Sequence, residues 1–169
     1  QEVRYLRKVL RLKPGGQVDV VDGRGHLWTA LLIAGDQLEL TSDRAQPLET
    51  GVKPLPQLGL AMALVRRGMD DVMRMTCELG LDHVQPIQAD RSVPQAEHRP
   101  ERWGVILQEA VEQSERLWMP DLHPRLQSGR WWMDPASDDM RLIAVTRDVG
   151  SPHLETWLAQ AAKPAPRIW

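Results

Sequence analysis

The stretch LGLAMALVRRGMDDVMRMTCELGLDHVQPIQ, residues 58–88, changes its hydrophobic period twice and thereby decides the fold. The apolar run at 58–65 predicts a buried strand. Apolar residues then recur at helical spacing up to Gly80, at Met69, Val72, Met73 and Leu79. The run HVQPIQ predicts a second strand. The order strand, helix, strand indicates an α/β unit with a largely parallel sheet.

The segments that follow continue this alternation. An apolar stripe between residues 103 and 118 predicts an amphipathic helix, with its buried face formed by Trp103, Ile106, Leu107, Ala110, Val111, Leu117 and Trp118. The run MRLIAVTRD at 140–148 predicts a third strand. Ser151 and Pro152 read as an N-cap and first helical residue, before a helix whose inward face carries Leu154, Trp157, Leu158, Ala161 and Ala162.

The first forty residues have a different pattern. From Val9 to Leu40, short runs with strand composition alternate with turn sequences, in the order VLRL, KPGG, QVDVV, DGRG, HLWTALLI, AGDQ and LEL. Strands at such close spacing predict a small β-barrel. The polar stretch 42–57 carries three prolines and reads as a linker. We therefore expect domains at 1–50 and 58–169, joined by 51–57.

Composition restricts the possible partners. Hydrophobic residues make up 42% of the chain and charged residues 26%, with a formal net charge of −2, so the chain is globular and has no overall basic field. A local basic cluster occupies the first thirteen residues, at Arg4, Arg7, Lys8, Arg11 and Lys13. Two interpretations of this cluster stay open: solvated surface cations, or contacts to RNA phosphates.

Several classes of site lack their sequence signature. Cys77 is the single cysteine, so an internal disulfide is excluded, and the five histidines are not at metal-ligand spacing. We expect no metal. No Walker, nucleophile-elbow or complete dinucleotide-binding sequence is present. The longest apolar run is too short to span a bilayer and no signal sequence opens the chain, so we expect a soluble cytoplasmic protein without a membrane partner.

Four segments, in this order, resemble the bacterial SPOUT-class methyltransferases that modify a uridine at N3 in 16S ribosomal RNA. They are LRKVLRLKPGGQVDVVDGRG (6–25), RRGMDDVMRMTCELGLDHVQPIQADRSV (66–93), RWGVILQEAVEQSERLWMP (102–120) and LIAVTRD (142–148). The resemblance implies an N-terminal PUA-like β-barrel that docks 16S ribosomal RNA or the small ribosomal subunit. It further implies an α/β SPOUT domain of the trefoil-knot type that binds S-adenosylmethionine and forms a homodimer.

The chain also departs from the family pattern. Tyr5, Gly16 and Met75 stand where the family usually has histidine, an acid and lysine. The family's G-P-E-G-G loop, at the centre of the knot, would begin past Trp169. We therefore expect this chain to be a fragment with an incomplete knot, inactive by itself.

The resemblance also assigns candidate site residues. Arg116 closes the segment E-A-x-x-Q-S-x-R and is placed to contact an RNA phosphate or the uracil ring, where it is expected to stabilise charge on the uracil. Glu109 and Gln113, at neighbouring helical positions, are expected to hold it in place. The alternative is that these polar residues form only the solvated face of the helix. Arg91, in the turn ADRSV, is a candidate for RNA contact or for orienting the loop, with capping of nearby carbonyls as the alternative. The basic start supplies Arg4, Arg7, Lys8 and Arg11 for RNA. Cofactor contacts within this chain are expected at the strand end, at Thr146 and Arg147.

Three functions remain as alternatives at this point. The first is the methyltransferase. The second is a non-catalytic RNA-binding module, in which the barrel and its basic start supply the affinity. The third is a structural dimer without a role in RNA binding, for which the near-neutral net charge is the support.

Overall fold

The computed structural model describes residues 2–8, 10–35, 37–93, 96–134, 138–145, 150–160 and 165–169. The chain divides into two compact units, and each is described by itself. The N-terminal unit consists of Gln1–Lys53 together with Val111–Met119. The α/β unit consists of Pro54–Ala110 together with Pro120–Trp169.

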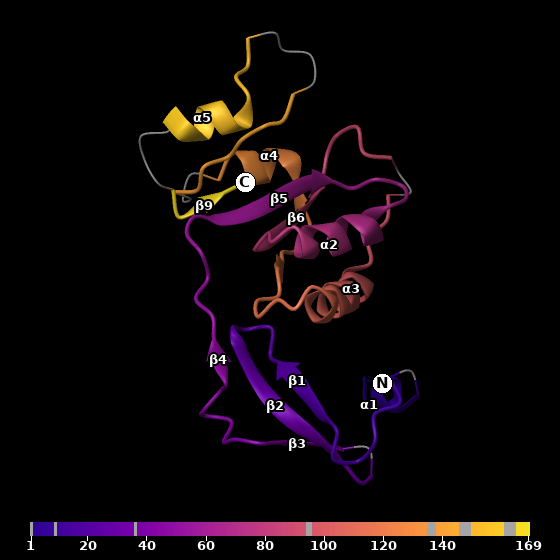
Figure 1. Cartoon of the computed structure of the whole chain (residues 1–169). Coiled ribbons are helices and arrows are strands. Elements are labelled where there is room, and N and C mark those ends of the chain that lie inside the picture. Colours follow the sequence, from indigo (N-terminus) through magenta and orange to yellow (C-terminus); the bar gives the residue numbers. More distant parts are fainter. Residues whose placement is uncertain are drawn as a thin grey trace. The chain divides into compact units, whose positions relative to one another are not determined.

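An antiparallel sheet of four strands forms the N-terminal unit (Figure 1). Its strands are β1 (Gln17–Val21), β2 (His26–Ile33), β3 (Gln37–Leu40) and β4 (Glu49–Thr50). The longest strand, β2, pairs with each of the other three. Alternate β2 side chains are buried, at Trp28, Ala30 and Leu32, so one face of the sheet carries the core of this unit. The antiparallel β-structure expected of the predicted small β-barrel is confirmed, and among the described residues the strands form a sheet in the order β1-β2-β3, with β4 paired to β2.

The start of the chain differs from the prediction of a strand at VLRL. Helix α1 (Glu2–Lys8) comes first, and the described residues from Leu10 to Lys13 have no strand partner. The helix is closed by the bond from Leu12 N–H to the Leu6 carbonyl (2.9 Å). Gly15 and Gly16 pair with Leu32 of β2, so the chain joins the sheet at these glycines. The short run VLRL alone could not distinguish a strand from a helix end.

The polar stretch 42–57 is not wholly a linker. Glu49 and Thr50 form β4 and pair with Leu27 and His26 of β2. A bond from Gly51 N–H to the Gly25 carbonyl (2.7 Å) extends this pairing. Backbone groups pair regardless of side-chain polarity, and composition therefore misses such a strand.

A parallel sheet is the centre of the α/β unit. Its strands run in the order β7 (Asp121–Leu122), β6 (His83–Gln88), β5 (Gln57–Ala63) and β9 (Arg167–Ile168), and β8 (Leu126–Gln127) also pairs with β6. All of these pairings are parallel. The predicted parallel α/β sheet is confirmed.

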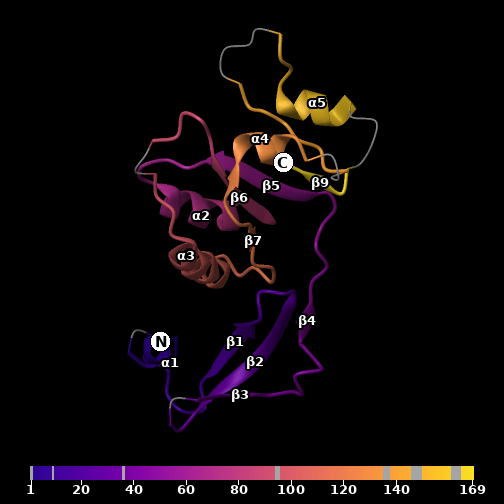
Figure 2. The same ribbon diagram turned by 180° about the vertical axis from the view of Figure 1, so that it is seen from behind.

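Helices lie on both sides of this sheet. Helices α2 (Met69–Glu78) and α3 (Pro100–Gln113) lie on one side, and α4 (Ser128–Trp132) and α5 (Leu154–Gln160) on the other (Figures 1 and 2). The predicted end of α2 near Gly80 is confirmed: Gly80 follows the C-cap residue Leu79 and has a left-handed φ of 87°. The buried core of the two helices and β6 includes Met69, Met73, Cys77, Val84, Ile87, Trp103, Ile106, Leu107 and Ala110.

The helix predicted to carry the apolar stripe through Trp118 is longer than the helix in the structure. Helix α3 ends at Gln113, and Glu115 has a left-handed φ of 53°. Residues 117–119 instead pair with the β1–β2 turn, through Gly25 N–H to the Leu117 carbonyl (2.8 Å) and Met119 N–H to the Gly23 carbonyl (2.9 Å). Leu117 and Trp118 therefore pack within the N-terminal unit, because the glycines of that turn leave space for them.

The last part of the chain also corrects two expectations. Of the strand predicted at 140–148, the described residues show an isolated bridge from Met140 to Ile168 and no strand at 141–145. Helix α5 begins at Leu154 rather than at Pro152. Leu154 is 59% exposed and Leu158 is 39% exposed, so the predicted inward face is not buried in this unit. Ala161 and Ala162 lie outside the described residues.

Candidate nucleic-acid interface

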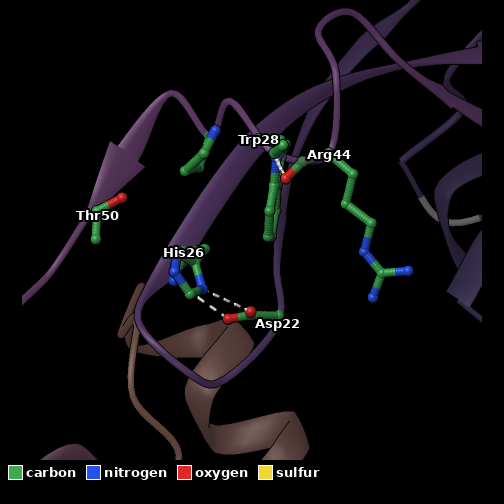
Figure 3. A pocket seen from close by; sticks show the side chains of 7 residues that line it. Asp22, His26, Trp28, Arg44 and Thr50 are labelled. Carbon is green, nitrogen blue, oxygen red and sulfur yellow. Dashed lines mark hydrogen bonds and ion pairs between the residues drawn. The ribbon is translucent and has the colours of Figure 1, made fainter.

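The β1–β2 turn is organised by one carboxylate. The Asp22 Oδ1 atom accepts hydrogen bonds from the backbone N–H groups of Arg24 (2.7 Å) and His26 (3.1 Å). The Asp22 Oδ2 atom lies 2.8 Å from His26 Nδ1, and the two side chains point toward one another in Figure 3. Burial raises the pKa of the Asp22 carboxyl, but the hydrogen bonds from Arg24 and His26 and the interaction with the imidazole lower it by more. The Asp22 pKa therefore lies below its ordinary value.

A pocket of about 380 Å³ opens beside this turn (Figure 3). It lies between the start of β2 and the loop 41–48, and is lined by Asp22, His26, Trp28, Arg44, Ala45, Pro47 and Thr50. The Trp28 indole N–H donates to the Arg44 carbonyl (3.2 Å), so the buried ring fixes the loop on the sheet. Asp43 and Ser42 close the loop through bonds to Ala45 and Gln46. The pocket therefore has walls that hydrogen bonds hold in place.

The basic residues at the start of the chain lie on and after α1. Arg7 is half-buried, and its Nη2 donates to the Ile33 carbonyl (3.4 Å), so this side chain has a structural contact at the end of β2. Lys8 and Arg11 are exposed, and Arg11 has a left-handed φ of 54°. Arg4 lies in α1, and its side chain is outside the described part. Lys8 and Arg11 are accessible to a polyanion.

Arg116 lies beyond the helix that was expected to carry it. Its backbone N–H donates to the Val111 carbonyl (3.1 Å) after the left-handed Glu115, and its side chain is half-buried. Glu109 and Gln113 are exposed on α3. Helix α3 ends at Gln113, so Arg116 is not on the helix that carries these two residues, and their role in holding Arg116 stays a prediction. The catalytic role of Arg116 stays a prediction.

Arg91 lies in the turn that follows β6 and is exposed. Ser92 closes this turn, because its Oγ accepts from Ala89 N–H and its N–H donates to the Ala89 carbonyl, both at 3.0 Å. Within the described residues the Arg91 side chain caps no carbonyl. RNA contact therefore stays the open prediction for Arg91. Thr146 and Arg147, the expected cofactor residues, lie outside the described residues.

The sequence did not predict a cluster of rings at the amino end of the parallel sheet. His83 Nε2 lies 2.7 Å from Gln57 Oε1, and His123 Nε2 lies 3.2 Å from His83 Nδ1. The Trp169 ring lies 5.5 Å from both imidazoles. Burial lowers the pKa of His123 below its ordinary value. These residues are far apart in the sequence, and only the parallel register of β6 with β7 and of β5 with β9 brings them together.

A second pocket, of about 330 Å³, lies where the pairing beside β6 is interrupted. Both β7 and β8 pair with β6, but the backbone pairing is interrupted between them, because Pro86 and Pro124 have no N–H. In this gap the Gln85 side chain donates from Nε2 to the Pro124 carbonyl (2.7 Å). The pocket is mainly apolar and includes the fully buried Trp103.

In the described part of the chain, no group of three or more His, Cys, Asp or Glu residues could hold a metal ion. None of the helices described there is long and apolar enough to cross a membrane.

An antiparallel N-terminal unit followed by a parallel α/β unit defines a two-part α/β protein. The chain belongs to the RNA methyltransferase family: residues 53–169 match its RNA methyltransferase domain, and residues 1–43 match the RNA methyltransferase PUA domain. The family resemblance of the four sequence segments is thereby confirmed.

Individual relatives agree with this assignment. The chain is 36% identical, over 171 aligned residues and 97% of its length, to the ribosomal RNA small subunit methyltransferase E of Synechocystis sp.. It covers 54% of that relative, and thus spans about half of its length. The crystal structure of ribosomal RNA small subunit methyltransferase E from Neisseria gonorrhoeae, bound to S-adenosyl methionine, is 26% identical, with a TM-score of 0.76 over 99% of this chain and 68% of that one.

A more distant structure shows the same fold. It is described as a probable rRNA-methyltransferase from Porphyromonas gingivalis and is 23% identical, with a TM-score of 0.73. The match covers 87% of this chain and 62% of that one.

Proposed function

We propose that this chain is part of a methyltransferase that transfers a methyl group from S-adenosylmethionine to N3 of a uridine in 16S ribosomal RNA. The observation that carries this proposal is the 36% identity to a ribosomal RNA small subunit methyltransferase E over nearly the whole chain. In this proposal the N-terminal unit docks the RNA, and the enzyme acts in the cytoplasm as a homodimer.

The cofactor is proposed from a relative, because the Neisseria gonorrhoeae structure is bound to S-adenosyl methionine. When bound, the cofactor supplies the methyl group. The described segments that follow β5 and β6, at 64–68 and 89–93, contain no buried side-chain atom that lacks a hydrogen-bond partner. They therefore offer no identifiable cradle for the cofactor. We propose that the main contacts to the cofactor lie outside this chain.

The chemistry proposed for Arg116 follows from the substrate. N3 of uracil carries a proton at neutral pH, and its loss leaves negative charge on the ring and its oxygens. A guanidinium held in place can stabilise this charge, although it cannot accept the proton. The backbone of Arg116 is fixed on one side by the bond to Val111, and the next residues are fixed by pairing with the turn at Gly23–Gly25. This restraint supports a preorganised side chain.

The test of this function uses the full-length protein and small ribosomal subunits from cells that lack the methylation. Arg116→Ala should lower the single-turnover rate of methyl transfer about 100-fold, roughly 2.7 kcal/mol, with cofactor affinity nearly unchanged. Arg116→Lys should also be slow, because it keeps the charge but loses the planar fork. Arg74→Ala is the matched control, since Arg74 is exposed on α2 and pairs only with Asp71 among the described residues.

The possible outcomes separate the function from the residue. No methyl transfer by the wild-type protein would refute the enzyme. A near-wild-type rate for Arg116→Ala would refute only the role of this residue.

The chain by itself should not bind S-adenosylmethionine tightly, since the proposed cofactor loops follow Trp169. Isothermal titration calorimetry on this chain and on a chain extended beyond Trp169 tests this directly. Saturable micromolar binding by the shorter chain would show that the pocket lies within it. The strand end at Thr146 and Arg147 is then the place to examine by substitution.

A second candidate function is an RNA-binding module without catalysis. It is supported by the pocket in the N-terminal unit and by the exposed Lys8 and Arg11. Tight, salt-dependent RNA binding together with an extended chain that binds no S-adenosylmethionine would favour this alternative.

A further inference from the structure

We propose that the pocket between the β1–β2 turn and the loop 41–48 binds one nucleotide of a single-stranded RNA segment. The proposal rests on the proposed function, in which RNA is the substrate, and it adds a specific docking site in the N-terminal unit. Three features of the pocket carry it: an exposed arginine side chain, a ring nitrogen that acts as a hydrogen-bond acceptor, and a partly exposed aromatic ring.

The available cation is Arg44. Its backbone carbonyl is occupied by the Trp28 indole, but its side chain is exposed and forms no hydrogen bond or ion pair with another described residue. Figure 3 shows this side chain extending from the loop, on the side of the Trp28 ring away from His26 in this view. A guanidinium that is not engaged in the protein can bind a phosphate with two parallel hydrogen bonds. The Trp28 bond holds the Arg44 backbone, so the point from which the side chain extends is fixed.

The available nitrogen is Nε2 of His26. A carboxylate only accepts hydrogen bonds, so the contact of His26 Nδ1 with Asp22 Oδ2 places the proton on Nδ1. In the neutral ring this fixes Nε2 as an acceptor. No hydrogen bond joins Nε2 to any residue in the described part of the chain. A base that presents an N–H or amino group can fill this position.

The ring surface comes from the same residue. The His26 side chain is 40% exposed, and its ring packs at 5.6 Å and 39° against the buried Trp28 ring. Trp28 therefore supports the imidazole from within the sheet and leaves its outer part accessible. Nucleic-acid bases stack on aromatic side chains of this kind in sequence-tolerant recognition of single strands.

These features select a nucleotide over other ligands. An isolated carboxylate would satisfy Arg44, but it offers His26 neither a hydrogen-bond donor nor a planar ring. A nucleotide carries an anion, a planar ring and N–H donors in one unit. The volume of about 380 Å³ lies at the lower end of the usual range for small-ligand sites, which fits one nucleotide.

Binding of a fluorescein-labelled oligouridylate to the chain, followed by fluorescence anisotropy at several salt concentrations, tests the proposal. Arg44→Ala should weaken binding about tenfold, and the slope of log K against log salt should fall by about 0.7, the value for one phosphate contact on a single strand. Arg24→Ala is the matched control. It removes the same charge from the same unit, but Arg24 does not line the pocket. Equal effects of the two substitutions would overturn the proposal.

His26→Asn tests the imidazole, meaning its Nε2 acceptor together with its ring surface, separately from the Arg44 cation. The asparagine amide can still donate to Asp22, while the acceptor at Nε2 is lost. Binding should weaken about fivefold without a change in the salt slope, because no phosphate contact is removed. An affinity equal to that of the wild type would overturn the role of His26. Uridine monophosphate should compete with the labelled RNA at lower concentration than inorganic phosphate does. Equal competition would show a simple anion site and would also overturn the proposal.

A measurement on the wild-type chain does not depend on the folding of any variant. Oligouridylate that contains 4-thiouridine should crosslink to peptides that contain residues 22–28 or 44–50, and crosslinks confined to other peptides would count against the pocket. Methyl transfer by the full-length protein distinguishes the two proposals. If transfer occurs and Arg44→Ala behaves like Arg24→Ala, only the pocket is refuted. If the pocket results hold and no transfer occurs, only the proposed function is refuted.

Discussion

Gly25 is the residue at which a single methyl group should most clearly test the packing of the N-terminal unit. Its φ is 98°, and a Cβ added there would lie 2.4 Å from Trp118 Cζ2 and 2.9 Å from the Gly51 carbonyl oxygen. That oxygen also accepts the Trp118 indole N–H (3.1 Å). Any shift of the ring away from the new methyl group therefore strains this hydrogen bond as well.

The magnitude follows from a matched pair of glycines. Gly35 also has a positive φ, of 80°, but an added Cβ there meets nothing within 4 Å. At both sites alanine in a left-handed conformation costs about 1–2 kcal/mol, offset by about 0.4–1 kcal/mol from the reduced entropy of the unfolded chain. At Gly25 the overpacking adds about 1–3 kcal/mol. We expect Gly25→Ala to lower the free energy of unfolding by about 2–4 kcal/mol, and Gly35→Ala by about 1 kcal/mol.

Urea denaturation of protein labelled with 5-fluorotryptophan and followed by ¹⁹F NMR measures this difference. Trp28 and Trp118 are the tryptophans of the N-terminal unit, so their signals report on its unfolding separately from the α/β unit. The midpoint should shift at an unchanged m-value if the two-state description applies. Equal destabilisation by Gly25→Ala and Gly35→Ala would refute the close approach of Trp118 to the turn.

Three further predictions concern other parts of the chain. Since burial lowers the folded-state pKa of His123, the unfolded chain binds a proton first as the pH falls below about 6.5, so the free energy of unfolding should decrease from pH 7.5 toward that lowered pKa. A pH titration of urea midpoints should show a flatter dependence for His123→Gln, and an unchanged slope would contradict this. Trp103→Ala should cost about 3–5 kcal/mol in urea denaturation, whereas Trp132→Ala, at a residue 44% exposed, should cost much less, and similar costs would contradict the burial. Arg11→Ala should lower the salt slope of RNA binding by about 0.7 without loss of stability, while Arg7→Ala should also destabilise the fold through its contact with Ile33; an unchanged slope for Arg11→Ala would argue against RNA contact.

The parts of the fold that sequence predicted well are those with local signals. The β5–α2–β6 order and the end of α2 at Gly80 follow from hydrophobic period and glycine chemistry within about thirty residues. The buried stripe of α3 was likewise correct from Trp103 to Val111. In the same helix the prediction failed beyond Gln113, because Leu117 and Trp118 fit the helical period but pack against the glycines of a distant turn.

The candidate site was less accessible to sequence reasoning. Arg116 was placed on a helix that ends before it, and Thr146 and Arg147 lie outside the described residues. The Asp22–His26 pair had a local signal, since a carboxylate before G-x-G can cap its own turn. The pocket beside this pair had no local sequence signal. Arg44 contacts Trp28 through its backbone carbonyl, and a pattern of side chains does not predict the partner of a backbone group.

The sequence by itself determined the two-part organisation, the parallel α/β pattern and the positions of the main turns, because these depend on periodicity and on the backbone freedom of nearby residues. Only the tertiary structure decided where Trp118 packs, that Glu49 and Thr50 join the N-terminal sheet, and that His83 and His123 meet beside Trp169. The physical reason is that backbone hydrogen bonds and ring contacts between distant segments depend on three-dimensional register. A one-residue change in register would replace every such contact while leaving the local sequence pattern intact.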